Sequence, residues 1–467
     1  MPTSPQLPLQ RDVVICGAGM AGLCAALAAL EVGATVTVIE KSSTIGGSLA
    51  LSGGLIWTFE DFDSVRLNVP TGNPALQELV VDSLPGELDW LRSLGVQMGP
   101  IESLVNGIGR RASPRQAIQA MAGTIRASGG MITPDSSLET LEEGDESLVV
   151  RVRGTITGDE TQILCQSAVL CTGGFQGAAD LVWTWLGVRP DDLLLRSNSY
   201  SRGDGLIAAI NLGASLTNGL QSFYGHALAD VPDLQETSDN FRGLSQYYGK
   251  HAVALNLCGD RFADESVGTG EEVLNEQLSR QPHARGFYLV DGMTSATVRL
   301  PNGEPCIQAI RQAEDAGAKV ISAPTIDQLI ARLAEAGLPA RRVETTLNDF
   351  KQALVTGAPL YPPRAANRRT LTEPPFYAVP VRAAITFTCG GLAVDRKMRV
   401  LRRACQKSAA VEVDPTTDDR DHAPAIAGLF AAGVDVGNVS CRGYVGGLAT
   451  ALVTGKIAGF ESAQRRS

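Results

Sequence analysis

The sequence predicts an α/β fold in which the two ends of the chain form one domain around a parallel sheet and the middle forms an inserted α+β cap domain. Near the N-terminus, a short apolar strand, a glycine turn and a helix follow one another. A strand and a glycine-rich helix start recur near the C-terminus, and helices with clear boundary residues occupy the middle. The expected domain limits are 1–235 and 379–467 for the two parts of the first domain and 236–378 for the cap.

Composition indicates a globular protein with a substantial interior. The 467 residues are 44% hydrophobic and 19% charged, which leads us to expect about two domains. The net charge is −10 and no run of Lys or Arg stands out, so nucleic acid is not an expected partner. No stretch approaches the roughly 20 apolar residues that span a bilayer, and the Pro-rich N-terminus has no signal-peptide core. We therefore expect a cytoplasmic protein without a transmembrane segment.

The cysteines do not predict a metal, haem or iron–sulfur site. No Cys-x-x-Cys pair occurs, and the chain has only four histidines. We interpret the cysteines as small buried residues in a reducing compartment. They are Cys16, Cys24, Cys165, Cys171, Cys258, Cys306, Cys389, Cys405 and Cys441.

The first strand, turn and helix have the pattern of a phosphate-binding unit. Asp12 to Cys16 is an apolar, β-branched run that suits a strand buried in a parallel sheet. Gly17 then permits a tight turn, Gly19 lets the backbone approach a pyrophosphate, and Gly22 lets helix and strand pack closely. The helix that continues to Leu30 directs its positive end at the phosphates.

An acidic residue stands where a ribose is usually bound. A second strand, Thr35 to Ile39, ends at Glu40, about 20 residues beyond the glycines, where a carboxylate can accept hydrogen bonds from adenosine hydroxyls. The alternative is a solvated glutamate at a strand end. Only one complete Gly-x-Gly-x-x-Gly unit appears, so a dedicated NAD(P)H domain is not expected. Electrons should instead pass through the substrate and a separate donor or acceptor.

The continuation distinguishes FAD from NAD. After Glu40 and Lys41 come Gly46-Gly47-Ser48 and then Ser52-Gly53-Gly54. This segment resembles the FAD superfamily that contains glutathione reductase, and most of all its branch of fumarate reductase flavoproteins and 3-ketosteroid dehydrogenases. The resemblance implies a Rossmann-type FAD-binding domain with the second glycine pair beside the flavin. Members with covalent flavin carry a histidine at the place of Gly47, so the resemblance implies non-covalent FAD.

Later motifs extend the resemblance from Asp12 to Gly459. Val169 to Phe175 is similar to the family's strand and Ala-Thr-Gly-Gly turn, Ser201 to Gly205 to its Thr-Gly-Asp-Gly, and Gly428 to Gly433 to its second flavin-contacting strand. The last helix, which opens within Tyr444 to Thr450, directs its N-terminus at the flavin. The residues expected to contact FAD are Gly17, Gly19, Met20, Ala21, Gly22, Glu40, Lys41, Gly46, Gly47, Ser48, Ser52, Gly53, Gly54, Thr172, Gly173, Gly174, Asp204, Gly433, Asp435, Gly447, Leu448 and Ala449.

The cap contains two predicted helices. Thr325 to Gln328 reads as a capping box before the apolar positions Ile326, Leu329, Ile330 and Leu333. A Gly-Leu-Pro break at 337–339 separates this helix from a second helical run over 343–354. The segment 374–378 resembles the family's return to the flavin domain.

The resemblance implies transfer of a hydride equivalent between a substrate carbon and the flavin, paired with proton transfer at the adjacent carbon beside a carbonyl or carboxylate. Such a reaction makes or removes a carbon–carbon double bond. Two other readings remain open: a flavin oxidase that uses oxygen, and a protein whose FAD is mainly structural.

The substrate-side positions differ from those of fumarate reductases. Phe387 stands where those enzymes carry a histidine, Tyr444 replaces an arginine, and the segment 266–270, after the motif at 259–265, lacks their acid-donating arginine. These differences favour an apolar or cyclic carbonyl substrate. A fumarate reductase-like enzyme acting on a carboxylate is the alternative.

Four residues are candidates for catalysis. Tyr444, followed by Gly446, resembles the Tyr-Pro-Gly of ketosteroid dehydrogenases, where tyrosine and a nearby amide, here at Leu448, polarise the ketone; the alternative is a tyrosine that only caps the helix. Arg442 is a candidate for binding a substrate anion, or else an exposed loop arginine. His226, in a segment with Tyr224, matches a substrate-side histidine, or else is a core residue. Tyr248, next to Tyr247, is the candidate base.

Overall fold

The computed structural model describes residues 9–104, 107–232, 234, 238–268, 270–403 and 424–465. The chain divides into unit 1, which comprises Met1–Leu181, Ser197–Ser222 and Phe387–Ser467, and unit 2, which comprises Val182–Arg196 and Phe223–Thr386. The interval 236–378 that the sequence assigned to the cap lies inside unit 2. Cys405 lies outside the described residues. No helix in the described part of the chain is long and apolar enough to cross a membrane.

Unit 1 is built on an eight-stranded sheet with the order β19-β20-β9-β1-β2-β6, to which β8 and β7 add as a hairpin beside β9. Strands β20, β9, β1, β2 and β6 run parallel, whereas β19 and β8 are antiparallel to their neighbours. The strands are β1 (Gln10–Cys16), β2 (Val36–Ile39), β6 (Met131–Thr133), β7 (Ser136–Glu143), β8 (Leu148–Gly154), β9 (Glu160–Leu170), β19 (Arg399–Leu401) and β20 (Ala425–Ala431).

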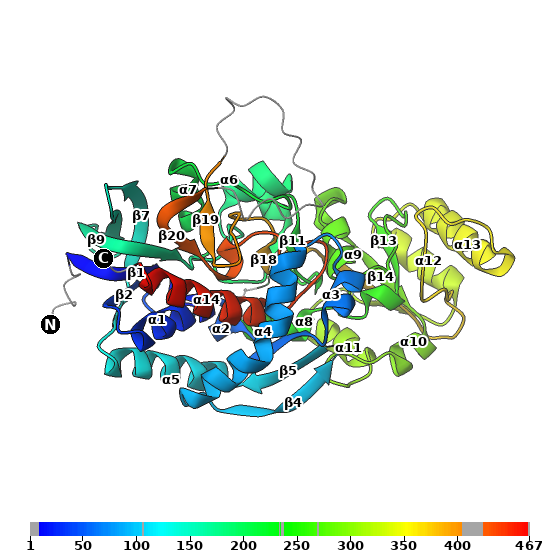
Figure 1. The fold of residues 1–467 in the computed structure, drawn as a ribbon. Helices are drawn as coiled ribbons and strands as arrows, with labels where there is room; N and C mark the ends of the chain where they lie inside the picture. Colours follow the sequence, from blue (N-terminus) through cyan, green and yellow to red (C-terminus); the bar gives the residue numbers. More distant parts are fainter. Residues whose placement is uncertain are drawn as a thin grey trace. The chain divides into compact units, whose positions relative to one another are not determined.

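The two ends of the chain meet through α1 (Met20–Glu31) and α14 (Gly447–Ala463), which lie against each other in Figure 1. A Cβ on Gly455 would lie 2.4 Å from the Ala21 carbonyl oxygen, and one on Gly459 would lie 2.1 Å from that of Ala25. The two backbones therefore approach closely only because α14 carries glycine at both positions. This contact explains why α1 is buried over most of its surface and why both ends belong to unit 1.

Further elements surround the sheet of unit 1. A three-stranded antiparallel sheet has the order β3-β5-β4. Helix α4 begins with Asn73, whose side chain caps the first turn, and Pro74, which needs no N–H there. The elements are α2 (Gly47–Leu51), β3 (Leu55–Phe59), α3 (Phe62–Asn68), α4 (Pro74–Ser93), β4 (Met98–Leu104), β5 (Gly107–Ala112), α5 (Pro114–Ala127), α6 (Ala179–Leu181), α7 (Asp204–Asn211), β18 (Phe387–Thr388) and the short 3-10 helix Gly433–Asp435.

Unit 2 contains a five-stranded antiparallel sheet with the order β12-β16-β14-β13 and β15 beside β16. Its core is apolar and includes Leu255, Leu289, Leu329, Leu333 and Phe350. The strands are β10 (Leu194–Leu195), β11 (Phe223–Tyr224), β12 (Leu228–Ala229), β13 (Val253–Asn256), β14 (Arg285–Val290), β15 (Ile321–Ala323), β16 (Phe376–Arg382) and β17 (Ala384–Ile385). The helices are α8 (Ser238–Leu244), α9 (Glu272–Leu278), α10 (Gly292–Thr297), α11 (Ile307–Asp315), α12 (Ile326–Glu335) and α13 (Ala340–Thr356).

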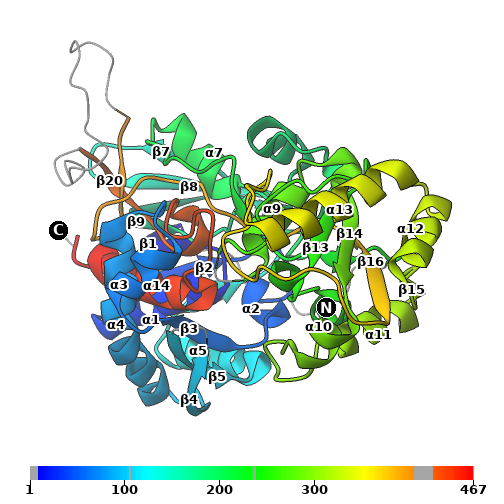
Figure 2. The ribbon, with the colours of Figure 1, turned by 90° about the vertical axis from the view of Figure 1, so that its right-hand side faces the viewer.

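The two helices predicted for the cap are present. The Thr325 hydroxyl accepts a hydrogen bond from the Gln328 N–H at 3.2 Å and caps α12, as the sequence predicted. The helix ends before Gly337, which has a φ of 99°, and α13 begins at Ala340. Figure 2 shows α12 and α13 near β14, β15 and β16, whose side chains form one core with those of the two helices.

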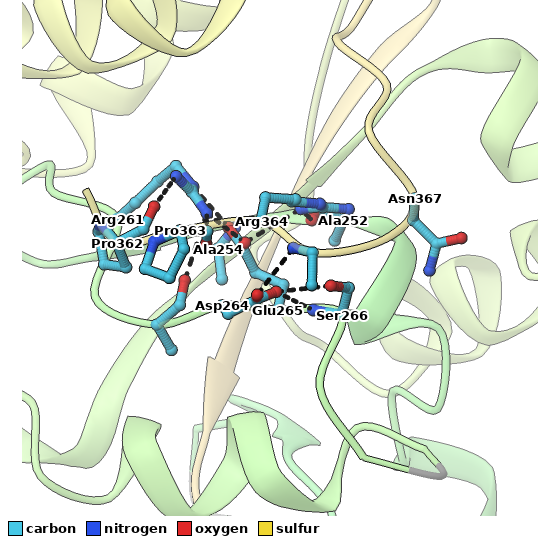
Figure 3. A network of polar contacts seen from close by, with 12 residues as sticks. Ala252, Ala254, Arg261, Asp264, Glu265, Ser266, Pro362, Pro363, Arg364 and Asn367 are labelled. Atoms are coloured by element: carbon cyan, nitrogen blue, oxygen red, sulfur yellow. Dashed lines mark hydrogen bonds and ion pairs between the residues drawn. The ribbon is translucent and has the colours of Figure 1, made fainter. Parts of the chain in front are cut away.

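A buried ion network joins three segments of unit 2 (Figure 3). The Glu265 carboxylate lies 2.5 Å from a guanidinium nitrogen of Arg261 and 3.1 Å from one of Arg364. All three side chains are at most 3% exposed. The guanidinium groups also donate to backbone carbonyls of Ala252 and Pro362, so the network ties the loop before β16 to β13.

Candidate functional site

The glycine turn between β1 and α1 has the geometry expected of a phosphate cradle. A Cβ on Gly17 would lie 2.2 Å from the Cys171 carbonyl oxygen, and one on Gly22 would lie 1.8 Å from that of Gly17. A Cβ on Gly19 would instead have only the Gly46 carbonyl oxygen, 4.0 Å away, within 4 Å. Met20 and Ala21 form the first turn of α1, which has no side-chain cap. The N–H groups at the start of a helix have no partner within the helix and can bind an anion.

Glu40 lies at the end of β2 and closes the cradle. Its carboxylate accepts hydrogen bonds from the N–H groups of Ala18 at 2.7 Å and Ser42 at 2.8 Å. Burial raises the pKa of this carboxyl group, while the backbone N–H groups of Ser42 and Ala18 oppose the shift. Each carboxylate oxygen has a second acceptor position, so these bonds leave capacity for ribose hydroxyls.

Lys41 and Asp204, both predicted cofactor residues, form an ion pair of 2.7 Å. They line a pocket of about 460 Å³ whose wall also includes Ser137, Glu139 and Arg153. Asp204 opens α7 behind Gly203, which has a φ of 79°. The structure thus places a polar pocket beside the proposed adenosine end of the site.

The second glycine segment lies against the first. The Gly46 N–H donates to the Ala18 carbonyl oxygen at 2.9 Å, and a Cβ on Gly47 would lie 3.2 Å from the Gly19 Cα. Gly47 and Ser48 begin α2, Ser52 ends it, and Gly53 and Gly54 lead into β3. A Cβ on Gly54 would lie 1.9 Å from the Ala112 carbonyl oxygen. Only glycine therefore fits at this last position.

Asp435 contacts the segment that follows β9, which comprises Thr172, Gly173 and Gly174. The Asp435 carboxylate accepts from the Thr172 hydroxyl at 3.0 Å and from the Gly173 N–H at 3.0 Å. Burial raises the pKa of Asp435 to about 7, although these hydrogen bonds oppose the shift. Gly433 opens the same short helix as Asp435.

The start of α14 brings Tyr444 together with Gly447, Leu448 and Ala449. The Gly447 N–H donates to the Tyr444 hydroxyl at 3.0 Å, which is the helix-capping role that we gave as an alternative. This bond uses an acceptor position of the phenol and not its proton. The Tyr444 ring stacks on Trp57 with centroids 6.1 Å apart and lies 6.3 Å from Phe387.

Arg442 lies two residues before Tyr444 on the surface. Its side chain is exposed, and its backbone φ is 52°, in the left-handed region that an arginine rarely adopts. Among the described residues, no carboxylate forms an ion pair with it.

His226 lies in unit 2 within a chain of polar groups. Its Nε2 is 2.7 Å from the Tyr224 hydroxyl, and its Nδ1 is 3.0 Å from Oε1 of Glu271. The Tyr247 ring packs edge-on against the imidazole with centroids 4.6 Å apart. Burial, assisted by the charge of Arg196, lowers the pKa of His226 well below its ordinary value.

Tyr248 has surroundings that disfavour a role as a base. Its side chain is buried, and no described group forms a hydrogen bond with its hydroxyl. Burial raises its pKa well above 10, with further contributions from Cys306 and Glu271. A phenol that is harder to ionise than free tyrosine is rarely present as the phenolate, which is the form that accepts a proton.

Three residues of this region were not identified from the sequence. Glu271 lies 45 residues after His226 in no recognisable motif. Arg196 donates to Ser245, Thr386 and Tyr247. Arg364 lies in an irregular loop, and its partner Glu265 is far away in the chain. Contacts between such distant positions carry no local pattern.

The residues of unit 1 fit a dinucleotide cofactor. The open side of Gly19 together with the uncapped start of α1 can receive a pyrophosphate. The side-chain oxygens Oε1 of Gln176 and Oγ1 of Thr388 are buried without a hydrogen-bond partner among the described residues. Both lie near the predicted flavin residue Gly174, where an added Cβ would be 2.5 and 2.2 Å from them. Buried polar atoms of this kind usually have a partner, and a flavin can supply one.

Comparison with known proteins agrees with this fit. The model of the FAD binding domain family matches residues 12–448. A probable fumarate reductase, Ifc3, of Shewanella frigidimarina is 24% identical and is matched over 97% of this chain and 75% of its own length. Urocanate reductase of Eggerthella lenta is 25% identical, over 99% of this chain and 76% of that protein.

Among solved structures, this chain matches that of 3-ketosteroid Δ1-dehydrogenase of Sterolibacterium denitrificans with a TM-score of 0.71. That structure was solved in complex with 1,4-androstadiene-3,17-dione. It is 16% identical, and the match covers 98% of this chain and 100% of that chain. At this identity the likeness shows the fold alone, and it confirms the predicted α/β flavoprotein architecture. The chain belongs to the FAD binding domain family and is an FAD-dependent oxidoreductase.

Proposed function

We propose that this protein introduces, or in reverse reduces, a carbon–carbon double bond beside the carbonyl group of an apolar or cyclic ketone. The observation that carries the proposal is the environment of Tyr444. Its phenol is flanked by the rings of Trp57 and Phe387. Phe387 and Tyr444 themselves stand where the dicarboxylate enzymes of the family have a histidine and an arginine. An apolar wall with one neutral donor suits a ketone better than a dianion.

FAD, held by the glycine cradle, Glu40 and the Asp204 and Asp435 regions, supplies the acceptor or donor for a hydride equivalent. The chain itself has to bind the ketone, polarise its oxygen and move one proton. We assign the polarising hydrogen bond to the phenol proton of Tyr444, because the Gly447 N–H holds its oxygen at the start of α14. A preorganised donor to a developing oxyanion contributes about 3 kcal/mol to transition-state stabilisation.

A second candidate function is reduction of an unsaturated carboxylate. Two observations favour it: relatives named fumarate reductase and urocanate reductase match nearly the whole chain, and Arg442 has an exposed side chain without a described carboxylate partner. An arginine of this kind can bind a carboxylate through two parallel hydrogen bonds.

Tyr444→Phe tests the assignment. We expect the rate of flavin reduction by a saturated cyclic ketone to fall on the order of a hundredfold, because about 3 kcal/mol of oxyanion stabilisation is lost. The measurement is anaerobic stopped-flow absorbance of the flavin. FAD content should stay at the wild-type value.

Tyr200→Phe is the matched control, because it removes an exposed phenol hydroxyl from the same unit and should leave the rate unchanged. If Tyr444 only caps α14, Tyr444→Phe lowers the thermal stability and keeps the rate. That result would refute the proposed role.

A further inference from the structure

We propose that Trp57 of β3 positions the phenol of Tyr444, so that the contact between β3 and the start of α14 sets the direction in which the phenol proton points. The inference rests on the proposed function, since it identifies the residue that orients its hydrogen-bond donor. Both residues belong to unit 1. Trp57 acts through Tyr444 and is therefore a positioning residue.

The rings of Trp57 and Tyr444 lie parallel to each other. Their planes differ by 3° and their centroids are 6.1 Å apart, within the range of interacting aromatic pairs. Because a phenol O–H bond stays close to the plane of its ring, fixing the ring also fixes the plane of the proton. The Gly447 N–H donates to the phenol oxygen at 3.0 Å and occupies one acceptor position. The proton is left to point to the side of the oxygen that this N–H does not occupy.

The indole of Trp57 is itself held in place by the neighbouring strands. Its N–H donates to the Leu104 carbonyl oxygen at 2.9 Å. On β5, an added Cβ would lie 2.5 Å from the Trp57 ring at Gly107 and 2.8 Å from the Trp57 Cα at Gly109. Strand β5 therefore has glycine where a side chain would displace the indole. Trp57 can serve as a fixed support for the ring that stacks on it.

Strand β3 also holds the backbone that follows Tyr444. The buried Thr58 hydroxyl donates to the Val445 carbonyl oxygen at 2.8 Å. Gly446 has a φ of 103°, and a Cβ there would lie 1.8 Å from the Trp57 carbonyl oxygen, so only glycine allows this approach. Two adjacent residues of β3 thus contact the two residues after Tyr444. The backbone and the ring of Tyr444 are both fixed against the same strand.

Exposure distinguishes the supporting residue from the residues that can meet a ligand. Trp57 is 7% exposed, whereas Tyr444 and Phe387 are half-buried. The Phe387 ring is tilted by 45° from that of Tyr444, with centroids 6.3 Å apart, so it does not fix the plane of the phenol by parallel stacking. Trp57 has little surface left for a ligand. Its effect on a reaction therefore has to pass through Tyr444.

Two substitutions of Trp57 separate the stacking contact from the hydrogen bond to Leu104. Trp57→Phe loses that hydrogen bond but keeps an aromatic ring beside Tyr444, whereas Trp57→Leu loses both. In Trp57→Leu we expect the kcat of flavin reduction by a saturated cyclic ketone to fall on the order of tenfold to a hundredfold with little change in KM, because a misplaced donor stabilises the transition state less. Trp57→Phe should stay close to the wild-type rate.

A double variant and a control sharpen the comparison. Trp57→Leu combined with Tyr444→Phe should be no slower than Tyr444→Phe alone, because Trp57 acts through the phenol. Trp90→Leu removes an indole from α4 of the same unit, where it contacts Glu31 and Lys456, and should keep the wild-type rate. FAD content is measured in every variant, so that loss of cofactor is not mistaken for loss of positioning.

Fluorine NMR tests the orientation of the ring without any substrate. The protein is labelled with difluorotyrosine, which carries fluorine on both edges of the ring, and the signals of Tyr444 are assigned by comparison with Tyr444→Phe. A ring fixed by Trp57 flips slowly, so its two edges should give separate resonances in the wild type and in Trp57→Phe. In Trp57→Leu we expect one averaged resonance.

The outcomes separate this inference from the proposed function. If cyclic ketones leave wild-type flavin oxidised, or if Tyr444→Phe keeps the wild-type rate, the proposed function is wrong, and the NMR comparison still decides whether Trp57 fixes the ring. Separate resonances that persist in Trp57→Leu overturn the positioning role. Equal rate losses in Trp57→Leu and Trp57→Phe, or additive losses in the double variant, also overturn it.

Discussion

Glu265→Gln is expected to lower the free energy of unfolding by about 3–5 kcal/mol, the usual cost of removing one partner from a buried ion network. The substitution leaves the guanidinium groups of Arg261 and Arg364 buried without the carboxylate that pairs with both, and only the more weakly acting Asp264 still opposes the charge of Arg364. Their contacts with the ring of Phe350, 4.8 and 5.7 Å from the two guanidinium carbons, and with backbone carbonyls replace only part of that interaction. Chemical denaturation of the purified protein, followed by circular dichroism, measures the difference.

The control for this variant is Glu142→Gln. Glu142 also pairs with an arginine, Arg151, but both side chains are well exposed, so solvent screens the pair. We expect its unfolding midpoint to match that of the wild type. Equal midpoints for Glu265→Gln and Glu142→Gln would contradict the importance of the buried network.

The second large effect concerns the glycine cradle. Gly19→Ala should lower the affinity for FAD, whereas Gly22→Ala should lower the folding stability. Gly19 has φ −79° and ψ −170°, which alanine adopts without strain, and its Cβ would enter open space. Gly19→Ala should therefore fold normally but bind FAD on the order of a hundredfold more weakly, about 2.7 kcal/mol, because the methyl group occupies the pyrophosphate position.

In Gly22→Ala the new Cβ would lie 1.8 Å from a backbone oxygen, so the turn itself must move. We expect a loss of roughly 3 kcal/mol or more in folding stability, at the upper end of the cost of overpacking. Apoprotein stability and FAD titration distinguish the two variants. FAD is quantified after acid denaturation, which should release it because the site has no histidine tether. Normal FAD affinity in Gly19→Ala would place the pyrophosphate elsewhere.

Local patterns account for what the sequence predicted correctly. The strand, turn and helix from Gln10 to Glu31 are encoded by neighbouring residues, and Gly17 and Gly22 have the close contacts that their predicted roles require. Thr325 caps α12 as its position before an apolar stripe predicts. The last helix begins at Gly447, inside the segment that the resemblance indicated.

Long-range pairings account for what the sequence did not predict. Nothing near His226 indicates that Glu271 will meet it, and nothing near Glu265 indicates Arg364. These contacts arise only when separate segments of unit 2 fold together. Tyr224 and Tyr248 show the same limit, because both are aromatic residues near expected substrate positions, but only the former is hydrogen-bonded to a histidine.

The most direct test of the central claim is an anaerobic comparison of two substrates on the wild-type, FAD-loaded protein. The oxidised enzyme is mixed with a saturated cyclic ketone, and the reduced enzyme with fumarate, while the flavin absorbance is recorded. We predict that the ketone bleaches the flavin and yields the α,β-unsaturated product, whereas fumarate leaves the reduced flavin unchanged. Rapid oxidation of the reduced flavin by fumarate, without bleaching by any cyclic ketone, would contradict it.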